Sequence, residues 1–239
     1  MAKFALVPLL ALTTLIPAAA QSGSFDIAQH GKPVGTASFN FSATPNGYDS
    51  TSVVRIAMPG LAYSLSKTEK LTPASHLRHV QLSAAVNGAA VTVTGAPDSA
   101  QLLLNISASG HSSTTRLDPH PAAVFLPDFD PGAFETLLAL GIANNNRDLW
   151  AIIPKQAGSQ IGSIVPITLA TYADEQGTLD GKPITVHHLV ATIGAAVTQL
   201  FSGPENQLLQ AELPQEGFAL VRKGFVLTPP ASPGAPPAQ

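Results

Sequence analysis

Hydrophobic side chains alternate with polar or small ones along most of the chain. Leu61, Tyr63 and Leu65 are each followed by Ala or Ser, and the same period of two returns over residues 80–86. This period is typical of a strand with one buried face. Asn-Gly pairs, which favour two-residue hairpin turns, interrupt the alternation. We therefore predict a meander of antiparallel strands over residues 24–117.

The period changes in the middle of the chain. Phe134, Leu137 and Leu138 follow helical spacing, and Asp130 followed by Pro is a favourable N-terminal start for a helix. We predict one helix over residues 131–143. Alternation then resumes, and we predict a second set of strands over residues 149–227.

Together these elements predict a mostly β protein with an antiparallel curved sheet, a half-barrel or a sandwich, and one central α-helix. One β-rich domain is expected over residues 21–228. Residues 229–239 contain five Pro and no charged residue, which is typical of a disordered tail.

The first 20 residues have the organisation of a signal peptide. Lys3 precedes an apolar segment at residues 4–16, and three Ala at residues 18–20 form an A-x-A cleavage site. The apolar segment is shorter than the ~20 residues that span a bilayer, and no later segment is long enough either. We expect cleavage after Ala20, no transmembrane segment in the mature chain, and a periplasmic or secreted bacterial protein.

Composition narrows the function classes. Charged residues are 11% of the chain and the formal net charge is −3, which argues against a nucleic-acid partner. The chain has no Cys, which excludes disulfides, thiolate metal sites and a Cys nucleophile. We find no motif for a metal or a cofactor and expect neither.

Several weak signals, taken in order, resemble a group of uncharacterised bacterial envelope domains. They are Gly-Lys-Pro-Val-Gly at residues 31–35, Gly-x-Leu-Asp-Gly-Lys-Pro-Ile-x-Val at 177–186, Pro-Glu-Asn-Gln-Leu-Leu at 204–209, and Gly-Phe-x-Leu-Val-Arg at 217–222. The group's sheet is similar to the strongly bent sheet of the outer-membrane lipoprotein carriers. The resemblance implies a fold, a half-barrel that holds apolar chains, and no specific activity.

Five polar residues are candidates for a site. His120 lies in a Pro-bounded turn shortly before Asp128 and Asp130, and His187 and His188 are adjacent on a predicted strand. Adjacent strand residues point to opposite faces, so the last two are not expected to bind one metal ion. Turn, cap and core roles are the alternative for all five.

Five aromatic residues are candidates for lining a cavity, with core packing as the alternative. They are Trp150, Phe39, Phe41, Tyr63 and Phe125. Two functions stay open. The first is a non-catalytic envelope module whose partner is an apolar small molecule, a lipid or another envelope protein. The second is an exported hydrolase that assembles a His/carboxylate site from distant strands.

Overall fold

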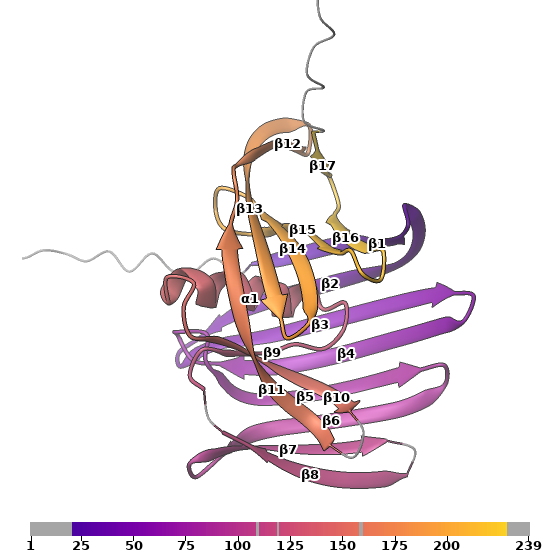
Figure 1. Ribbon diagram of the computed structural model, residues 1–239, viewed down its shortest axis with the longest axis vertical. Helices are drawn as coiled ribbons and strands as arrows, with labels where there is room; N and C mark the ends of the chain where they lie inside the picture. The colour runs from indigo at the N-terminus through magenta and orange to yellow at the C-terminus, as the bar shows by residue number, and fades with distance from the viewer. Residues whose placement is uncertain (1–20, 109, 119, 158–159, 229–239) are drawn as a thin grey trace, which may run out of the picture.

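The computed structural model describes residues 21–108, 110–118, 120–157 and 160–228 (Figure 1). The predicted signal peptide and the predicted Pro-rich tail lie outside these residues. The first half of the chain is a meander of eight antiparallel strands. Its strands are β1 (Ser22–Gln29), β2 (Lys32–Thr44), β3 (Gly47–Met58), β4 (Leu61–Leu71), β5 (Leu77–Val86), β6 (Ala89–Asp98), β7 (Gln101–Ala108) and β8 (His111–Leu117).

The meander forms because alternate side chains are apolar and the turns suit hairpins. In β3 and β4, Val54 and Leu65 are opposite each other and both are buried, while their neighbours along each strand are exposed. Asn87 and Gly88 form the β5–β6 turn, both with positive φ, as a tight hairpin requires. The predicted Asn-Gly turn is therefore present here.

The second half of the chain continues the same sheet from the other edge of β1. Phe25 in β1 is opposite Ala37 in β2 on one side and Arg222 in β16 on the other. From β16 the sheet runs through β15, β14, β13, β11 and β10 to β9. The bounds are β9 (Ala123–Phe125), β10 (Leu149–Ala157), β11 (Gln160–Thr171), β12 (Glu175–Leu179), β13 (Lys182–Ile193), β14 (Ala196–Ser202), β15 (Leu208–Leu213), β16 (Phe218–Arg222) and β17 (Phe225–Leu227).

The sheet bends so that its two halves face each other. Strand β9 contacts β5, and β11 contacts β8, so the far end of the second half crosses the meander (Figure 1). The sheet is mostly antiparallel, with β9 and β10 as a parallel pair, and it is not closed. Strands β12 and β17 form a small extension beside β13, with a separate apolar cluster around Phe201 and Phe225.

The helix α1 (Pro131–Ala143) lies inside the bend, in contact with β2, β3, β9 and β15. Asp130 is its N-cap and accepts a hydrogen bond from the Gly132 backbone N–H at 2.9 Å. Almost all of the helix is buried, as expected for a helix that is apolar around its circumference. A curved antiparallel sheet with one central helix is thus the observed fold, and the predicted fold class is confirmed.

Candidate functional site

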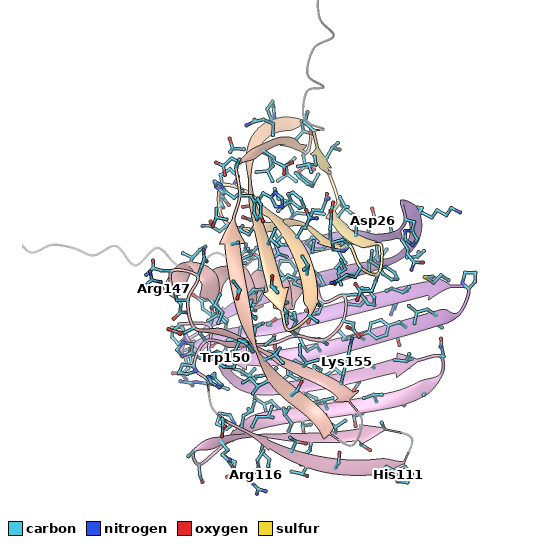
Figure 2. The ribbon with its side chains drawn as sticks, viewed as in Figure 1. Asp26, His111, Arg116, Arg147, Trp150 and Lys155 are labelled. Carbon is cyan, nitrogen blue, oxygen red and sulfur yellow. The ribbon has the colours of Figure 1, made fainter. Side chains whose placement is uncertain are left out.

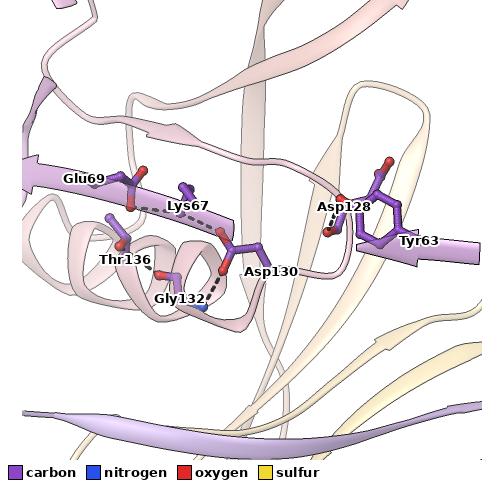
Figure 3. A network of polar contacts seen from close by, with 7 residues as sticks. All are labelled: Tyr63, Lys67, Glu69, Asp128, Asp130, Gly132 and Thr136. Atoms are coloured by element: carbon purple, nitrogen blue, oxygen red, sulfur yellow. Dashed lines mark hydrogen bonds and ion pairs between the residues drawn. The ribbon is translucent and has the colours of Figure 1, made fainter. Parts of the chain in front are cut away.

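Three charged side chains meet in the interior, between the helix and the meander (Figure 3). We call Lys67, Glu69 and Asp130 the buried ion cluster. The Lys67 Nζ lies 2.8 Å from the Glu69 Oε2 and 2.5 Å from the Asp130 Oδ2. All three side chains are 2% exposed or less. The cluster therefore joins β4 directly to the N-terminus of α1.

The strand alternation explains why these charges point inward. Lys67 and Glu69 continue the buried positions of Leu65 and Leu71 on β4. Across the ladder they are opposite Ser52 and Ser50 of β3, which are also buried. The inward face is therefore polar beneath the first turns of the helix and apolar on either side.

Electrostatics favours the ionised form of the central lysine. Burial lowers the pKa of Lys67, but Asp130 and then Glu69 outweigh it and raise that pKa above its usual range. Burial raises the pKa of Glu69, although Lys67 opposes the change. Because no solvent reaches the three groups, they act as a link between helix and sheet and offer no surface to a substrate.

A cavity of 610 Å³ lies against the inner face of the meander. We call it the groove. Its floor comes from inward-facing side chains of β4 to β7, and its opposite wall comes from residues around 127 and 154. The floor residues include Tyr63, Leu82, Ala84, Val86, Val91 and Ile106, and the wall residues are Pro127, Asp128, Pro154 and Lys155.

A few polar groups border this apolar floor. The Lys155 Nζ lies 2.6 Å from the Asp128 Oδ1, and both side chains are partly exposed. The Tyr63 hydroxyl donates to the Asp128 backbone carbonyl at 3.3 Å, and burial, with help from Asp128 and Asp130, raises the pKa of Tyr63 well above its usual range. The Ser113 hydroxyl is buried without a hydrogen-bond partner in the described chain. Figure 2 labels Lys155 on β10 and His111 at the start of β8, which also lines the groove.

A second cavity, of 290 Å³, lies where the described chain begins. We call it the N-terminal pocket. Glu135 of α1 lines it and is 5% exposed. Its Oε2 accepts from the Leu208 backbone N–H at 2.7 Å, and its Oε1 accepts from the Gln21 side-chain amide. Burial raises the pKa of Glu135 to about 7, although Leu208, Arg222 and Gln21 oppose the change.

The five aromatic candidates divide between core and cavities. Phe39, Phe125 and Tyr63 belong to the hydrophobic core, and Tyr63 is also at the edge of the groove. Phe41 lines the N-terminal pocket. Trp150 stacks on the His120 ring, with 3.8 Å between ring centroids.

The five polar candidates have separate partners. His120 stacks on Trp150, Asp128 pairs with Lys155, and Asp130 belongs to the buried ion cluster. The other two contact separate carboxylates: the His187 Nδ1 lies 2.9 Å from an Asp174 oxygen, and the His188 Nδ1 lies 3.1 Å from a Glu175 oxygen. In the described residues no hydrogen bond or ion pair joins any two of the five. No serine or threonine hydroxyl there bonds to a ring nitrogen of these three histidines.

Sequence reasoning missed Lys67, Glu69 and Glu135 as functional groups. The signal for the first two was their place in the alternation after Tyr63 and Leu65. Charged side chains are seldom fully buried, so the alternation alone does not predict that Lys67 and Glu69 point into the core.

The described residues contain no group of three His, Asp or Glu that could hold a metal ion. They also contain no helix long and apolar enough to cross a membrane. Comparison with known proteins found no matching family model, no matching curated protein and no matching solved structure.

Proposed function

We propose that this chain is an exported envelope protein that binds an apolar ligand in the groove. The observation that carries the proposal is the 610 Å³ cavity over an apolar sheet face. Cavities of ~300–1,000 Å³ with an apolar lining and a few polar groups are typical of small-molecule sites. A lipid or another apolar compound is the partner that such a lining suits.

The shape of the sheet supports this choice. The bend leaves the inner face of β5 to β7 away from the helix, and Ala84, Val86 and Val91 remain partly or largely exposed there. Water on that face is unfavourable, at about 25 cal/mol per Å² of apolar surface. An apolar ligand removes this cost. We propose the same use of a bent sheet as in the outer-membrane lipoprotein carriers.

Export is the second part of the proposal and rests on the predicted signal peptide. Cleavage after Ala20 gives a mature chain that begins at Gln21, the first described residue. A periplasmic or secreted location brings the groove into contact with envelope lipids.

The test combines ligand capture with a variant that fills the groove. The mature protein, isolated gently from its own envelope, is analysed by native mass spectrometry and by solvent extraction. Recombinant protein is titrated with the fluorescent fatty acid cis-parinaric acid. Ala84→Trp, whose side chain enters the groove, is compared with Ser83→Trp, whose side chain projects from the opposite, exposed face of β5.

We expect an added apolar mass on the native protein and a loss of probe binding of about tenfold or more in Ala84→Trp. A tenfold loss of affinity equals ~1.4 kcal/mol. The tryptophan ring reaches this value when it keeps about two methylene groups of the probe out of the groove. Ser83→Trp binds as the natural protein does. A bare native mass, together with equal probe binding by both variants, contradicts the proposal.

A further inference from the structure

Among the described residues, no cation bonds directly to the buried carboxylate of Glu135 in the N-terminal pocket. Glu135 is almost fully buried, and the groups that reach its two oxygens are a backbone N–H and a side-chain amide, both neutral. Carboxylates that are buried in proteins are generally paired with a cation. Arg222 is a cation that opposes the rise in the pKa of Glu135, but its guanidinium donates its hydrogen bonds elsewhere, to the backbone carbonyls of Leu208 and Ser22.

The residue beside Glu135 is Gln21, which the predicted cleavage turns into the first residue of the mature chain. Gln21 is held in place: its carbonyl accepts a hydrogen bond from the Phe41 backbone N–H at 2.7 Å, and its side chain lines the pocket. No described residue accepts a hydrogen bond from the Gln21 backbone nitrogen. That nitrogen is therefore available for a new partner.

We infer that the α-ammonium group of Gln21, released by cleavage after Ala20, binds in the N-terminal pocket as the counter-ion of Glu135. The inference rests on the processing step of the proposed function. Cleavage replaces an uncharged peptide N–H at residue 21 with a positive charge that carries three hydrogen-bond donors. The mature N-terminus and helix α1 thereby become an ion pair that the precursor lacks.

The other groups that face Glu135 fit this assignment. Among the described residues that line the pocket, the titratable ones besides Glu135 are Tyr48 and Glu205, and neither is a cation at neutral pH. Arg222, on β16, acts from outside the lining. A positive charge in the pocket therefore meets no other cation among its described lining residues and two carboxylates, Glu135 and Glu205.

The inference predicts a difference between two forms of the protein. When residues precede Gln21, the pKa of Glu135 is about 7, as burial dictates. An opposite charge within ~4–6 Å favours the ionised carboxylate. In the form that begins at Gln21, the proton affinity of Glu135 should therefore fall by about tenfold or more.

The effect on stability follows from the sign of the shift. A folded pKa above the unfolded value of 4.5 means that the folded state binds the proton more tightly. In the form in which residues precede Gln21, this contribution to stability is complete below pH ~4.5 and is lost as the pH rises through ~7. In the form that begins at Gln21 the loss is smaller and is complete at a lower pH.

The experiment uses two recombinant proteins with defined first residues. One begins at Gln21, from a fusion cut by a protease that leaves no extra residue, and the other begins at Ala19. Intact mass confirms each start and shows that Gln21 has not cyclised. Carbon NMR of the labelled carboxyl groups follows the titration of Glu135, and urea unfolding between about pH 5 and about pH 9 follows stability.

Two variants identify the group responsible. Glu135→Gln keeps the size of the side chain and removes its charge, so it should abolish the difference between the two starts in the pH dependence of unfolding. Glu205→Gln, in the same pocket, should leave that difference in place. Equal titration of Glu135 in the two forms overturns the inference. An intact mass from the native host that retains residues 1–20 overturns the export proposal instead, and the recombinant result stands apart from it.

Discussion

The two ends of strand β4 pack against different parts of the molecule. This difference explains where the interior holds a cavity and where it holds buried charges. At one end, Tyr63 faces the groove, whose rim carries the partly exposed pair Lys155–Asp128. At the other end, Lys67 and Glu69 lie beneath the first turns of α1, fully enclosed. The same strand, with the same alternation, holds an aromatic residue at the edge of the groove and a fully enclosed charged pair.

The difference shows that the helix determines what each position can do. Under the helix, a charge must be paired, because an unpaired buried charge costs several kcal/mol. Beyond the helix, solvent reaches the lysine and the carboxylate, and their attraction is weak. The substitutions below test this contrast and the packing of the helix.

The largest effect is expected from Lys67→Met. Removing the lysine leaves Glu69 and Asp130 facing each other in the core without a cation. Breaking a buried ion cluster in this way typically costs about 3–5 kcal/mol, which urea unfolding measures as a loss of the free energy of unfolding. Lys70→Met, at an exposed position on the same strand, is the matched control and should change it by less than about 0.5 kcal/mol.

A triple variant sharpens the same test. Lys67→Met, Glu69→Met and Asp130→Asn together remove every charge and keep a helix cap, so most of the lost stability should return. If the triple variant is as unstable as Lys67→Met alone, the loss arises from packing and not from the unpaired carboxylates.

A smaller effect is expected where the helix touches the sheet. A Cβ at Gly132 would lie 2.4 Å from the Ser52 Oγ and 3.1 Å from the Phe39 Cβ. Overpacking costs about 1–3 kcal/mol, and the better helix propensity of Ala returns up to about 1 kcal/mol. Gly132→Ala should therefore lower the melting temperature, as measured by circular dichroism.

Gly141→Ala is the comparison within the same helix. Its new methyl group would meet only the ends of the Asn146 and Leu169 side chains, which can move. This variant should be neutral or slightly more stable. Equal losses at the two glycines would mean that the approach of α1 to Ser52 and Phe39 is not the tight contact.

The smallest effect is expected from Lys155→Met at the rim of the groove. Both partners of its ion pair are partly exposed, and such pairs contribute about 0–1 kcal/mol. Urea unfolding should show a change in that range. A loss comparable to that of Lys67→Met would contradict the view that burial under the helix separates the two lysines.

Much of the fold follows from short-range patterns. The helix occupies Pro131–Ala143, as predicted, because Asp130, Pro131 and the spacing of Phe134, Leu137 and Leu138 all act locally. The hairpin at Asn87 and Gly88 follows from the same kind of local rule. The bend of the sheet does not follow from such rules. It depends on β1, which pairs with β2 on one side and with β16, almost at the other end of the chain, on the other side.

The site was harder to predict for the same reason. The sequence predicts Asp130 as a helix cap, and the cap hydrogen bond from Gly132 to its Oδ1 is present. Its other oxygen, Oδ2, pairs with Lys67, which lies far from it in the chain. The five polar candidates are close together only in the sequence, as His120 with Asp128 and Asp130 and as His187 with His188, and the fold gives each a different partner. Tyr63 and Phe41 line cavities that segments distant in the sequence build, which no local pattern encodes.

The position of β1 also has a consequence for the order of assembly. β1 is the first strand of the chain, and its second neighbour, β16, is almost the last: Phe25 is opposite Arg222. During synthesis, one edge of β1 stays without a partner until nearly the whole chain is present. Such non-local pairing slows folding, and unpaired strand edges are open to aggregation. The completed sheet is therefore one of the last structures to form, and the chain depends on its final strands to protect its first.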